Sequence, residues 1–342
     1  MPNNSTKILF LFTLISGVLI SLSANSWMGA WMGLEINLLS FIPLLSSSKN
    51  MFSTETSLKY FLIQAIASST LLFMVLTKVN LHEMFYLNQD SLWNNLLIMP
   101  LLMKIASAPF HWWLPSVVEG ASWMNCFIIL SIQKIAPLML ISYLLTNSLI
   151  IQSTIFMSAM IGAIGGFNQI SLRKILAYSS INHIAWMLTT MIMGPNVWLL
   201  YFMIYSINIM IIIPLAALIN MSYISQSFNS LNNMKLIKFT IFTSMLSLGG
   251  LPPFLGFFPK WIVIQFMTSN FMISTSFILI MSSLLTLYYY MRMMYSTLMM
   301  INSETTWFTT IQLKTSYNKL IMFGLLTIIL GMMASSTMIF TY

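Results

Sequence analysis

Long hydrophobic stretches fill almost the whole chain, and only short polar segments separate them. A helix needs about 17–25 apolar residues to cross a bilayer. Only helices and closed barrels satisfy their backbone in lipid, and these runs lack the alternation of barrel strands. The pattern predicts an all-α polytopic membrane protein with eleven transmembrane helices, at residues 7–24, 27–45, 57–78, 91–110, 122–145, 149–167, 172–193, 196–220, 239–268, 271–298 and 318–340.

The composition supports a membrane protein and excludes a soluble domain. The chain is 58% hydrophobic and 6% charged, whereas a soluble domain is about 25% charged. The net charge is +8, but the basic residues are scattered among loops without a stripe or a nucleic-acid-binding motif. We therefore expect no nucleic-acid partner.

Lysine and arginine lie almost entirely on one side of the predicted bundle. An excess of these residues marks the cytoplasmic or matrix side of a membrane. The 32 methionines, many at positions suited to isoleucine, have two explanations: adaptable packing in the core, or a genome that reads an isoleucine codon as methionine, as in animal mitochondria. We expect a multi-pass protein of the mitochondrial inner membrane with a matrix N-terminus and a C-terminus in the intermembrane space. The residues on the matrix side are Lys7, Lys49, Lys59, Arg173, Lys174, Lys235, Lys238, Arg292, Lys314 and Lys319, against Lys78 alone on the other side.

The first hydrophobic segment has an alternative interpretation as a signal peptide, with Ala24 as a weak cleavage position. A retained span is favoured, because Trp27 begins another hydrophobic stretch almost at once.

A proline-containing motif occurs twice, five spans apart. Residues 109–115 and 253–259 both read Pro-Phe-x-x-aromatic-x-Pro. An odd offset reverses the direction of the second helix, so the motif predicts two inverted five-helix repeats with discontinuous helices, as in many transporters. We assign residues 7–145 and 149–298 to the repeats and 318–340 to a C-terminal helix, within a single membrane domain 1–342. The residues predicted to break helices are Pro109, Pro115, Gly249, Gly250, Pro252 and Pro253.

Four charged residues fall near the centres of predicted spans: Glu35, Lys104, Lys134 and Lys260. Each costs about 2.5–3.5 kcal/mol at a helix centre, so such residues are functional candidates. A structural alternative pairs Glu35 with Lys104, but it leaves the other two lysines without an acidic partner within the membrane. Burial disfavours the charged amine, and a lysine that releases and regains a proton is suited to a proton relay.

His183 lies in the middle of another predicted span, among Tyr, Ser and Asn residues. Imidazole exchanges protons near neutral pH, although a lone buried histidine is often only structural. The three histidines lie on separate elements without metal-ligand spacing. The single cysteine, Cys126, cannot hold an iron–sulfur cluster by itself, and no Gly-rich nucleotide loop is present. We therefore expect no cofactor or metal in this chain.

Several ordered segments resemble the subunit 2 family of mitochondrial NADH–ubiquinone oxidoreductase, respiratory complex I. They cover residues 31–37, 104–115, 133–137, 172–180 and 249–261. The resemblance implies an antiporter-like membrane-arm subunit with a relay through Glu35, Lys104, Lys134, His183 and Lys260. One departure is Ser116, where many relatives have an acidic residue; a role of this loop in proton uptake would then need Glu119.

The resemblance also implies that the chain contributes to proton translocation coupled to electron transfer from NADH to ubiquinone. Flavin, iron–sulfur clusters and quinone would then lie in partner subunits. The expected partners are other membrane-arm subunits, protons, bound water and membrane lipid, with cardiolipin as a candidate. Two alternatives remain, namely a free-standing cation/proton antiporter and a purely structural membrane-arm subunit.

Overall fold

The structure, a computed structural model, describes residues 5–47, 50–84, 90–145, 148–226, 235–299, 321–327, 329–331 and 333. Helices make up the regular structure of this part, apart from one isolated β-bridge between Ser171 and Tyr223. The prediction of an all-α fold is confirmed. The chain divides into two compact units, Met1–Ser158 and Ala159–Tyr342, which are described separately.

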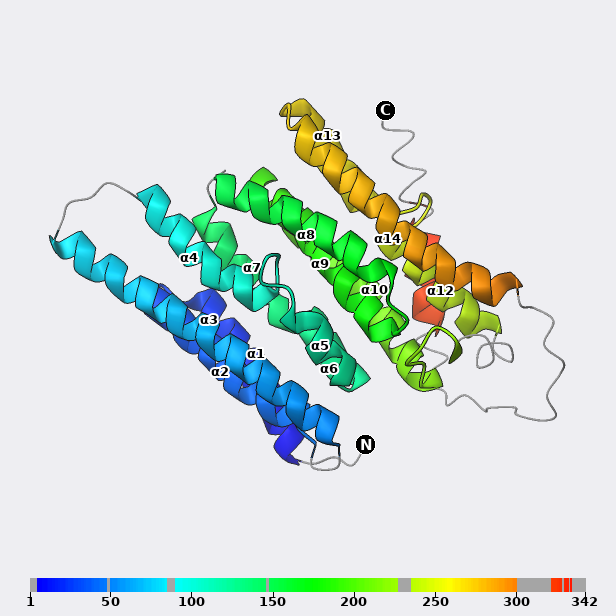
Figure 1. Ribbon diagram of the computed structural model, residues 1–342, viewed down its shortest axis with the longest axis horizontal. Coiled ribbons are helices and arrows are strands. Elements are labelled where there is room, and N and C mark those ends of the chain that lie inside the picture. Colours follow the sequence, from blue (N-terminus) through cyan, green and yellow to red (C-terminus); the bar gives the residue numbers. More distant parts are fainter. Residues whose placement is uncertain are drawn as a thin grey trace. The chain divides into compact units, whose positions relative to one another are not determined.

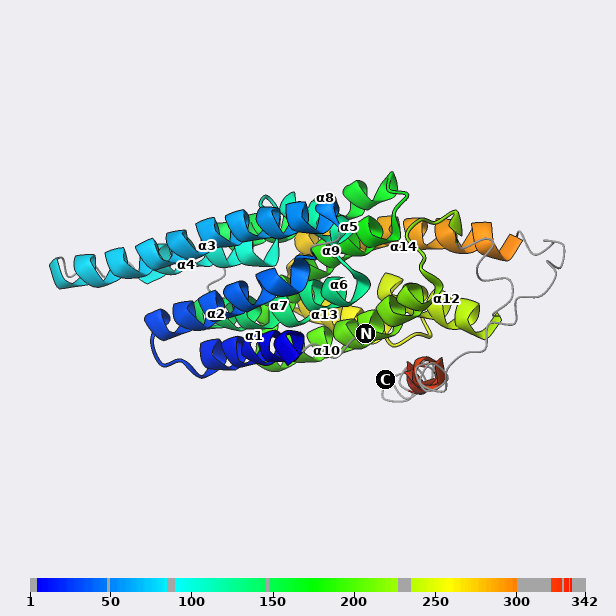
Figure 2. The ribbon, with the colours of Figure 1, turned by 90° about the horizontal axis from the view of Figure 1, so that it is seen from below.

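Unit 1 is a layered bundle. Helix α1 packs on α2, α2 on α3, and α3 on α4 and α5, while α7 packs against α1, α4 and α6 (Figures 1 and 2). The α1–α2 contact is very close, because a Cβ atom at Gly33 would lie 2.5 Å from the backbone nitrogen of Ser21. Small residues allow such backbone contact between membrane helices. The helices are α1 (Ser5–Ser23), α2 (Trp27–Leu45), α3 (Met51–Met84), α4 (Asp90–Ile105), α5 (Trp113–Gly120), α6 (Trp123–Leu130) and α7 (Ile132–Leu144).

Unit 2 is built around α9, which packs against α10, α13 and α14. Side chains on nearly all sides of α9 are buried, which is typical of a helix at the centre of a bundle. His183 lies on this central helix. Helix α8 (Leu149–Phe167) contains the division between the units; the others in unit 2 are α9 (Leu172–Met193), α10 (Pro195–Ile219), α12 (Lys235–Gly249), α13 (Phe257–Ser269) and α14 (Ile273–Met299).

Seven helical segments among the described residues are long and apolar enough to cross a membrane, whereas the sequence predicts eleven spans. The predicted span 172–193 is present as α9, but Ser, Asn and His residues interrupt its apolar run. The predicted spans 91–110 and 239–268 are interrupted, as the two proline motifs predict: the chain leaves the helix after Ile105 and after Gly249. The predicted helix 318–340 is described only in short pieces from residue 321 to residue 333.

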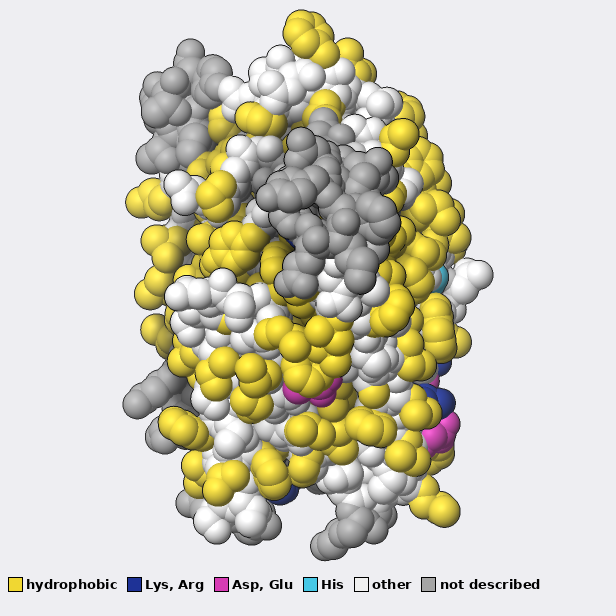
Figure 3. Space-filling model, turned by 90° about the vertical axis from the view of Figure 1, so that its left-hand side faces the viewer, with side chains coloured by type: hydrophobic (Ala, Val, Ile, Leu, Met, Phe, Trp, Pro, Cys, Tyr) yellow, Lys and Arg dark blue, Asp and Glu magenta, His cyan; other side chains and the backbone are white. Residues whose placement is uncertain are grey.

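The outer surface of the helices is hydrophobic, as Figure 3 shows for one face. Large side chains such as Phe12, Phe73, Met203 and Phe277 are exposed, which is the arrangement expected of helices that contact lipid. Three residues used to predict the orientation, Lys49, Lys314 and Lys319, lie outside the described residues, as does the side chain of Lys235.

Candidate proton-transfer site

The first helix interruption ends α4 beside Lys104. Ala106 has a left-handed backbone (φ 65°), and the Ser107 N–H donates to the Leu102 carbonyl at 3.1 Å. A left-handed residue with this backward hydrogen bond is a common way to end a helix. Pro109 lies inside the interruption. The prediction is wrong for Pro115, which lies in the first turn of α5, where a proline is tolerated because its missing N–H has no helical partner.

Side chains bind the carbonyl groups that the interruption leaves without helical partners. The Trp113 indole N–H donates to the Met103 carbonyl at 3.2 Å, and the Gln64 amide donates to the Lys104 carbonyl at 3.3 Å. The last carbonyls of a helix need such donors when they are buried. The broken end of α4 is therefore held from α5 and from α3.

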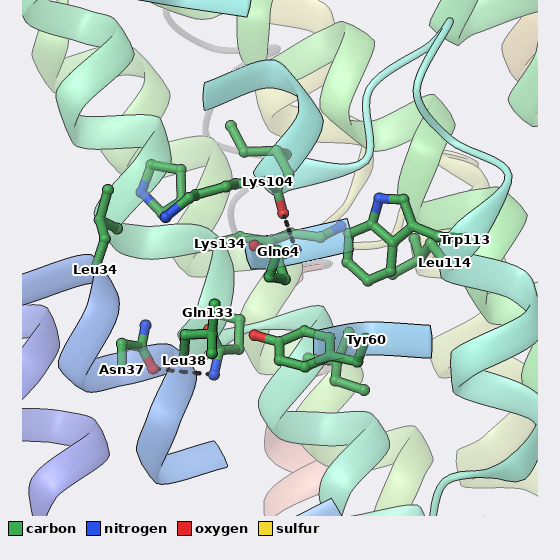
Figure 4. Close-up of a pocket in the computed structure, with 13 residues that line it drawn as sticks. Leu34, Asn37, Leu38, Tyr60, Gln64, Lys104, Trp113, Leu114, Gln133 and Lys134 are labelled. Atoms are coloured by element: carbon green, nitrogen blue, oxygen red, sulfur yellow. Dashed lines mark hydrogen bonds between the residues drawn. The ribbon is translucent and has the colours of Figure 1, made fainter. Parts of the chain in front are cut away.

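Lys104 and Lys134 line the same cavity in unit 1 (Figure 4). Their exposed fractions are 7% and 2%. A space of about 20 Å³ is open to the centre of a water molecule there, and one water requires roughly 10–15 Å³ by this measure. The cavity thus has room for a water molecule, and two buried lysines are part of its wall.

Neutral polar side chains complete the wall of this cavity. They are Asn37, Tyr60, Gln64 and Gln133. The Gln133 amide donates to the Asn37 side-chain oxygen at 3.0 Å, which joins α7 to α2 (Figure 4). The hydrophobic pattern and the charges of the sequence do not distinguish these residues. In the sequence, each of them is an amide or phenol side chain within an apolar span. Burying such a group without a hydrogen bond costs free energy, as burying a charge does, although the cost is smaller.

Glu35 is half-buried on α2, next to Leu34 in the cavity wall. Its charge interacts with Lys104, but within the described residues no ion pair of 4.0 Å or less joins the two side chains. The Glu35–Lys104 pairing is thus present in this structure as an interaction between charges and not as a direct ion pair. Glu35 acts on Lys104 from a longer distance, and a water molecule or a side-chain movement can change that interaction.

A further interruption precedes Lys134, at Ser131, between α6 and α7. The predicted continuous helix 122–145 is thus divided. The Ser131 hydroxyl donates to the Phe127 carbonyl at 2.6 Å, a bond by which serine competes with the helical ladder. No proline or glycine marks this position, so the sequence does not predict an interruption there.

In unit 2, Lys260 binds the broken end of α12. Its Nζ atom donates to the carbonyls of Leu248 and Gly249, at 3.1 and 2.9 Å. A cation is favourable at a helix C-terminus, where carbonyl groups point outward. The same Nζ lies 5.7 Å from the ring centre of Trp186, within cation–π range.

Gly250 allows Lys260 to reach these carbonyls. Its φ of +81° is strained for other residues, and an added Cβ would lie 2.7 Å from the Cδ atom of Lys260. Pro252 and Pro253 follow within the same interruption, which ends where α13 begins at Phe257. The glycines and prolines that interrupt the helix thus lie where Lys260 binds the last carbonyls of α12.

His183 is 5% exposed and shares a hydrogen bond of 2.9 Å between its Nδ1 atom and the Tyr201 hydroxyl. The ring of Tyr205 lies 5.0 Å away, centre to centre. The histidine is therefore surrounded by groups that can exchange protons with it. His111 is half-exposed and contacts the Pro109 carbonyl, and the side chain of His82 is outside the described residues.

Known proteins similar to this chain include a family of membrane subunits and several close relatives in sequence. The family model described as NADH:quinone oxidoreductase/Mrp antiporter, TM, matches residues 24–286. The NADH-ubiquinone oxidoreductase chain 2 of Locusta migratoria is 43% identical over 94% of this chain and 92% of its own. The corresponding protein of Aedes aegypti is 48% identical over 87% and 88%.

A solved structure shows the same fold. It is a chain of respiratory complex I from Thermus thermophilus, with a TM-score of 0.85 at 20% identity, and it matches over 98% of this chain and 79% of its own. The chain therefore belongs to the NADH:quinone oxidoreductase/Mrp antiporter transmembrane family, among the relatives called NADH-ubiquinone oxidoreductase chain 2.

Proposed function

We propose that this chain is a membrane-arm subunit of mitochondrial respiratory complex I and conducts protons as NADH is oxidised by ubiquinone. One observation carries the proposal: Lys104 and Lys134 line a single buried cavity with room for water. Two protonated lysines beside one low-dielectric cavity repel each other, so protonation of one favours proton release from the other. A proton that reaches one lysine can in this way displace a proton from the other.

Glu35 is the group that biases this exchange. Its charge favours the protonated form of Lys104, and the absence of a direct ion pair between these two described residues leaves the interaction open to adjustment. When the carboxylate is neutralised or moves away, Lys104 loses that stabilisation and gives its proton to the cavity. Asn37, Gln64 and Gln133 provide neutral hydrogen-bonding groups along the way.

His183 and Lys260 serve the same function in unit 2. Imidazole accepts and donates protons near neutral pH, and the Tyr201 hydroxyl bonded to it is an immediate exchange partner. The protonated form of Lys260 would make charge-assisted hydrogen bonds to the two carbonyls that its Nζ contacts, so release of its proton weakens the bonds at the end of α12.

The reaction that drives proton movement lies in partner subunits that hold flavin, iron–sulfur clusters and quinone. Coupling to it is a free energy shared between distant sites. The relatives' name, NADH-ubiquinone oxidoreductase, supports this assignment over a free-standing antiporter. Proton pumping that persists without Na⁺ and K⁺ in the assembled complex would agree with it; an absolute requirement for either cation would favour the antiporter.

Replacing Lys134 with Met tests the relay. We expect the assembled complex to oxidise NADH in the presence of a protonophore but to pump fewer protons per electron, because a buried proton-exchanging group is lost. Both quantities are measured in inner-membrane vesicles. Lys59→Met is the control, since Lys59 is exposed and pairs with Glu55 on the surface of α3. An unchanged proton-to-electron ratio in assembled Lys134→Met complex would show that the relay assignment is wrong.

A further inference from the structure

The indole ring of Trp186 on α9 lies beneath the side-chain amine of Lys260 in unit 2. The tryptophan is 1% exposed, and the Lys260 Nζ atom lies 5.7 Å from the centre of its ring. The negative face of an aromatic ring attracts a cation at this distance, and tryptophan does so more strongly than tyrosine or phenylalanine. Trp186 has no titratable group, so any effect that it has on proton movement is exerted through a neighbour.

Lys260 is held by dipoles and by this ring rather than by a carboxylate. Its Nζ atom contacts the carbonyls of Leu248 and Gly249 at 3.1 and 2.9 Å. Within the part of the chain that the structure describes, no carboxylate lies within 4.0 Å of it. A protonated lysine has three N–H donors, so the two carbonyls satisfy only part of its charge. The ring of Trp186 stabilises the charge further without adding a negative group.

The attraction between the ring and Lys260 depends on the charge of the lysine. A neutral amine can still form hydrogen bonds with the carbonyls, but it has no positive charge for the ring to attract. A cation–π contact away from water favours the bound, protonated state by roughly 30-fold. The ring therefore holds the side chain at the end of α12 while Lys260 is protonated, and holds it much less when the proton has left.

The contribution of Trp186 comes from its ring and not from a hydrogen bond. Its Nε1–H group is buried and has no acceptor among the described residues, whereas a buried indole N–H usually has one. Leaving a buried donor without an acceptor costs free energy. Phenylalanine would avoid this cost but has a weaker π face for a cation. Tryptophan is thus suited to the contact with Lys260.

Trp186 also places this contact next to His183. The two residues lie three positions apart on α9, which puts them on the same side of the helix, one turn apart. Helix α9 packs against α13, which bears Lys260, and against α10, which bears the Tyr201 hydroxyl bonded to His183. The ring therefore holds the lysine amine beside the turn of α9 that follows the imidazole.

We infer that Trp186 is a positioning residue, which holds Lys260 at the broken end of α12 while this lysine is protonated and releases it when the proton leaves. This inference rests on the proposed function. The proton passes from the ammonium to the next group of the relay, and the lysine nitrogen keeps the electron pair as a neutral amine. Trp186 neither gains nor loses a proton.

Two substitutions of Trp186 in the assembled complex test this role. Trp186→Leu removes the π face, whereas Trp186→Phe keeps a weaker one. We expect Trp186→Leu to lower the number of protons pumped per NADH oxidised, and Trp186→Phe to retain more of this number. Pumping is measured in inner-membrane vesicles and normalised to assembled complex on native gels. Normal pumping in Trp186→Leu, or equal losses in the two variants, would overturn the inference.

The matched control is Trp198→Leu, on α10 of the same unit. Trp198 is also 1% exposed, and its buried Nε1–H likewise lacks an acceptor among the described residues. Its ring packs edge-on against Phe202, at 6.3 Å between centres. We expect Trp198→Leu to keep the normal number of protons per NADH. A loss equal to that of Trp186→Leu would show that the removal of any large buried ring is sufficient, and would overturn the positioning role.

A double-variant cycle separates charge from packing. Lys260→Met keeps most of the apolar stem and removes the charge, so packing that is lost at Trp186 is lost in both backgrounds. We expect Trp186→Leu to accelerate thermal inactivation roughly 5- to 30-fold more with Lys260 than in the Lys260→Met background. Equal acceleration would assign Trp186 to packing and overturn the inference. If Trp186→Leu does not assemble, Trp186→Phe takes its place, with a smaller difference in the same direction.

Lys260→Met by itself reports on the proposed function. If Lys260→Met lowers pumping while Trp186→Leu pumps normally, the positioning role is wrong and the proposed function stands. Normal pumping in assembled Lys260→Met complex would remove Lys260 from the relay, and with it the role inferred for Trp186.

Discussion

Single residues in this protein combine a structural contact with a side chain that can bind and release a proton. Lys260 is buried and binds the last carbonyls of α12, while His183 is buried and bonded to Tyr201. Neither contact could have been derived from the sequence, because each depends on which carbonyl or hydroxyl the fold brings near. What the sequence does predict is that a charge within a span needs some such partner.

Gly250→Ala tests how closely Lys260 depends on the helix end. We expect a less stable complex, by about 1–2 kcal/mol from the left-handed backbone alone, and reduced proton pumping, because the new methyl group would lie 2.7 Å from the Lys260 Cδ atom. Thermal inactivation and proton-to-electron ratio are measured on the same preparation.

The control for this variant is Gly194→Ala. Gly194 also has a positive φ, of 151°, but an added Cβ there meets nothing within 4 Å. It therefore shares the backbone strain without the contact with lysine. Equal pumping defects in both variants would mean that backbone strain, and not displacement of Lys260, is responsible.

At the scale of the helices, both predicted interruptions are places where lysine and helix end meet. Glycine and proline signal them in the sequence, since these residues end helices for local steric reasons. The break at Ser131 has no such signal. It depends on a serine–carbonyl bond that many helical serines make without breaking the helix, so only the folded structure reveals it.

The broken end of α4 provides the test at this scale. Gln64→Leu and Trp113→Phe each remove a donor from a buried carbonyl at that end, and each is expected to destabilise the complex by about 1–3 kcal/mol. The carbonyls belong to adjacent residues, so the double variant is expected to show a coupling of roughly 0.5 kcal/mol or more. The measurement is thermal inactivation of the four complexes. Strictly additive losses would indicate that the two donors hold the helix end independently.

For the whole molecule, hydrophobic patterning is sufficient to predict an all-α membrane bundle, but not how each helix ends or what surrounds it. The central position of α9 is an example: polar residues such as Ser179, Asn182 and His183 interrupt its apolar sequence, yet it is buried nearly all round. Its polar residues face partners such as Ser282, which donates to Asn182 at 3.2 Å. Such pairs lie 100 residues apart, beyond the reach of local pattern reasoning.

The orientation of the whole molecule in the membrane is predicted from the distribution of its lysine and arginine residues. Lys78 near the end of α3 and Lys174 at the start of α9 are expected on opposite sides, with Lys174 in the matrix, because basic residues concentrate there. Single cysteines at these positions are treated with a membrane-impermeant maleimide in mitochondria without an outer membrane. We expect Lys78→Cys to react at once and Lys174→Cys to react only after the inner membrane is opened. The native Cys126 is 1% exposed, so the unsubstituted chain serves as the blank. Reaction of Lys174→Cys in sealed mitochondria, with Lys78→Cys protected, would reverse the orientation and place the start of α9 on the intermembrane-space side.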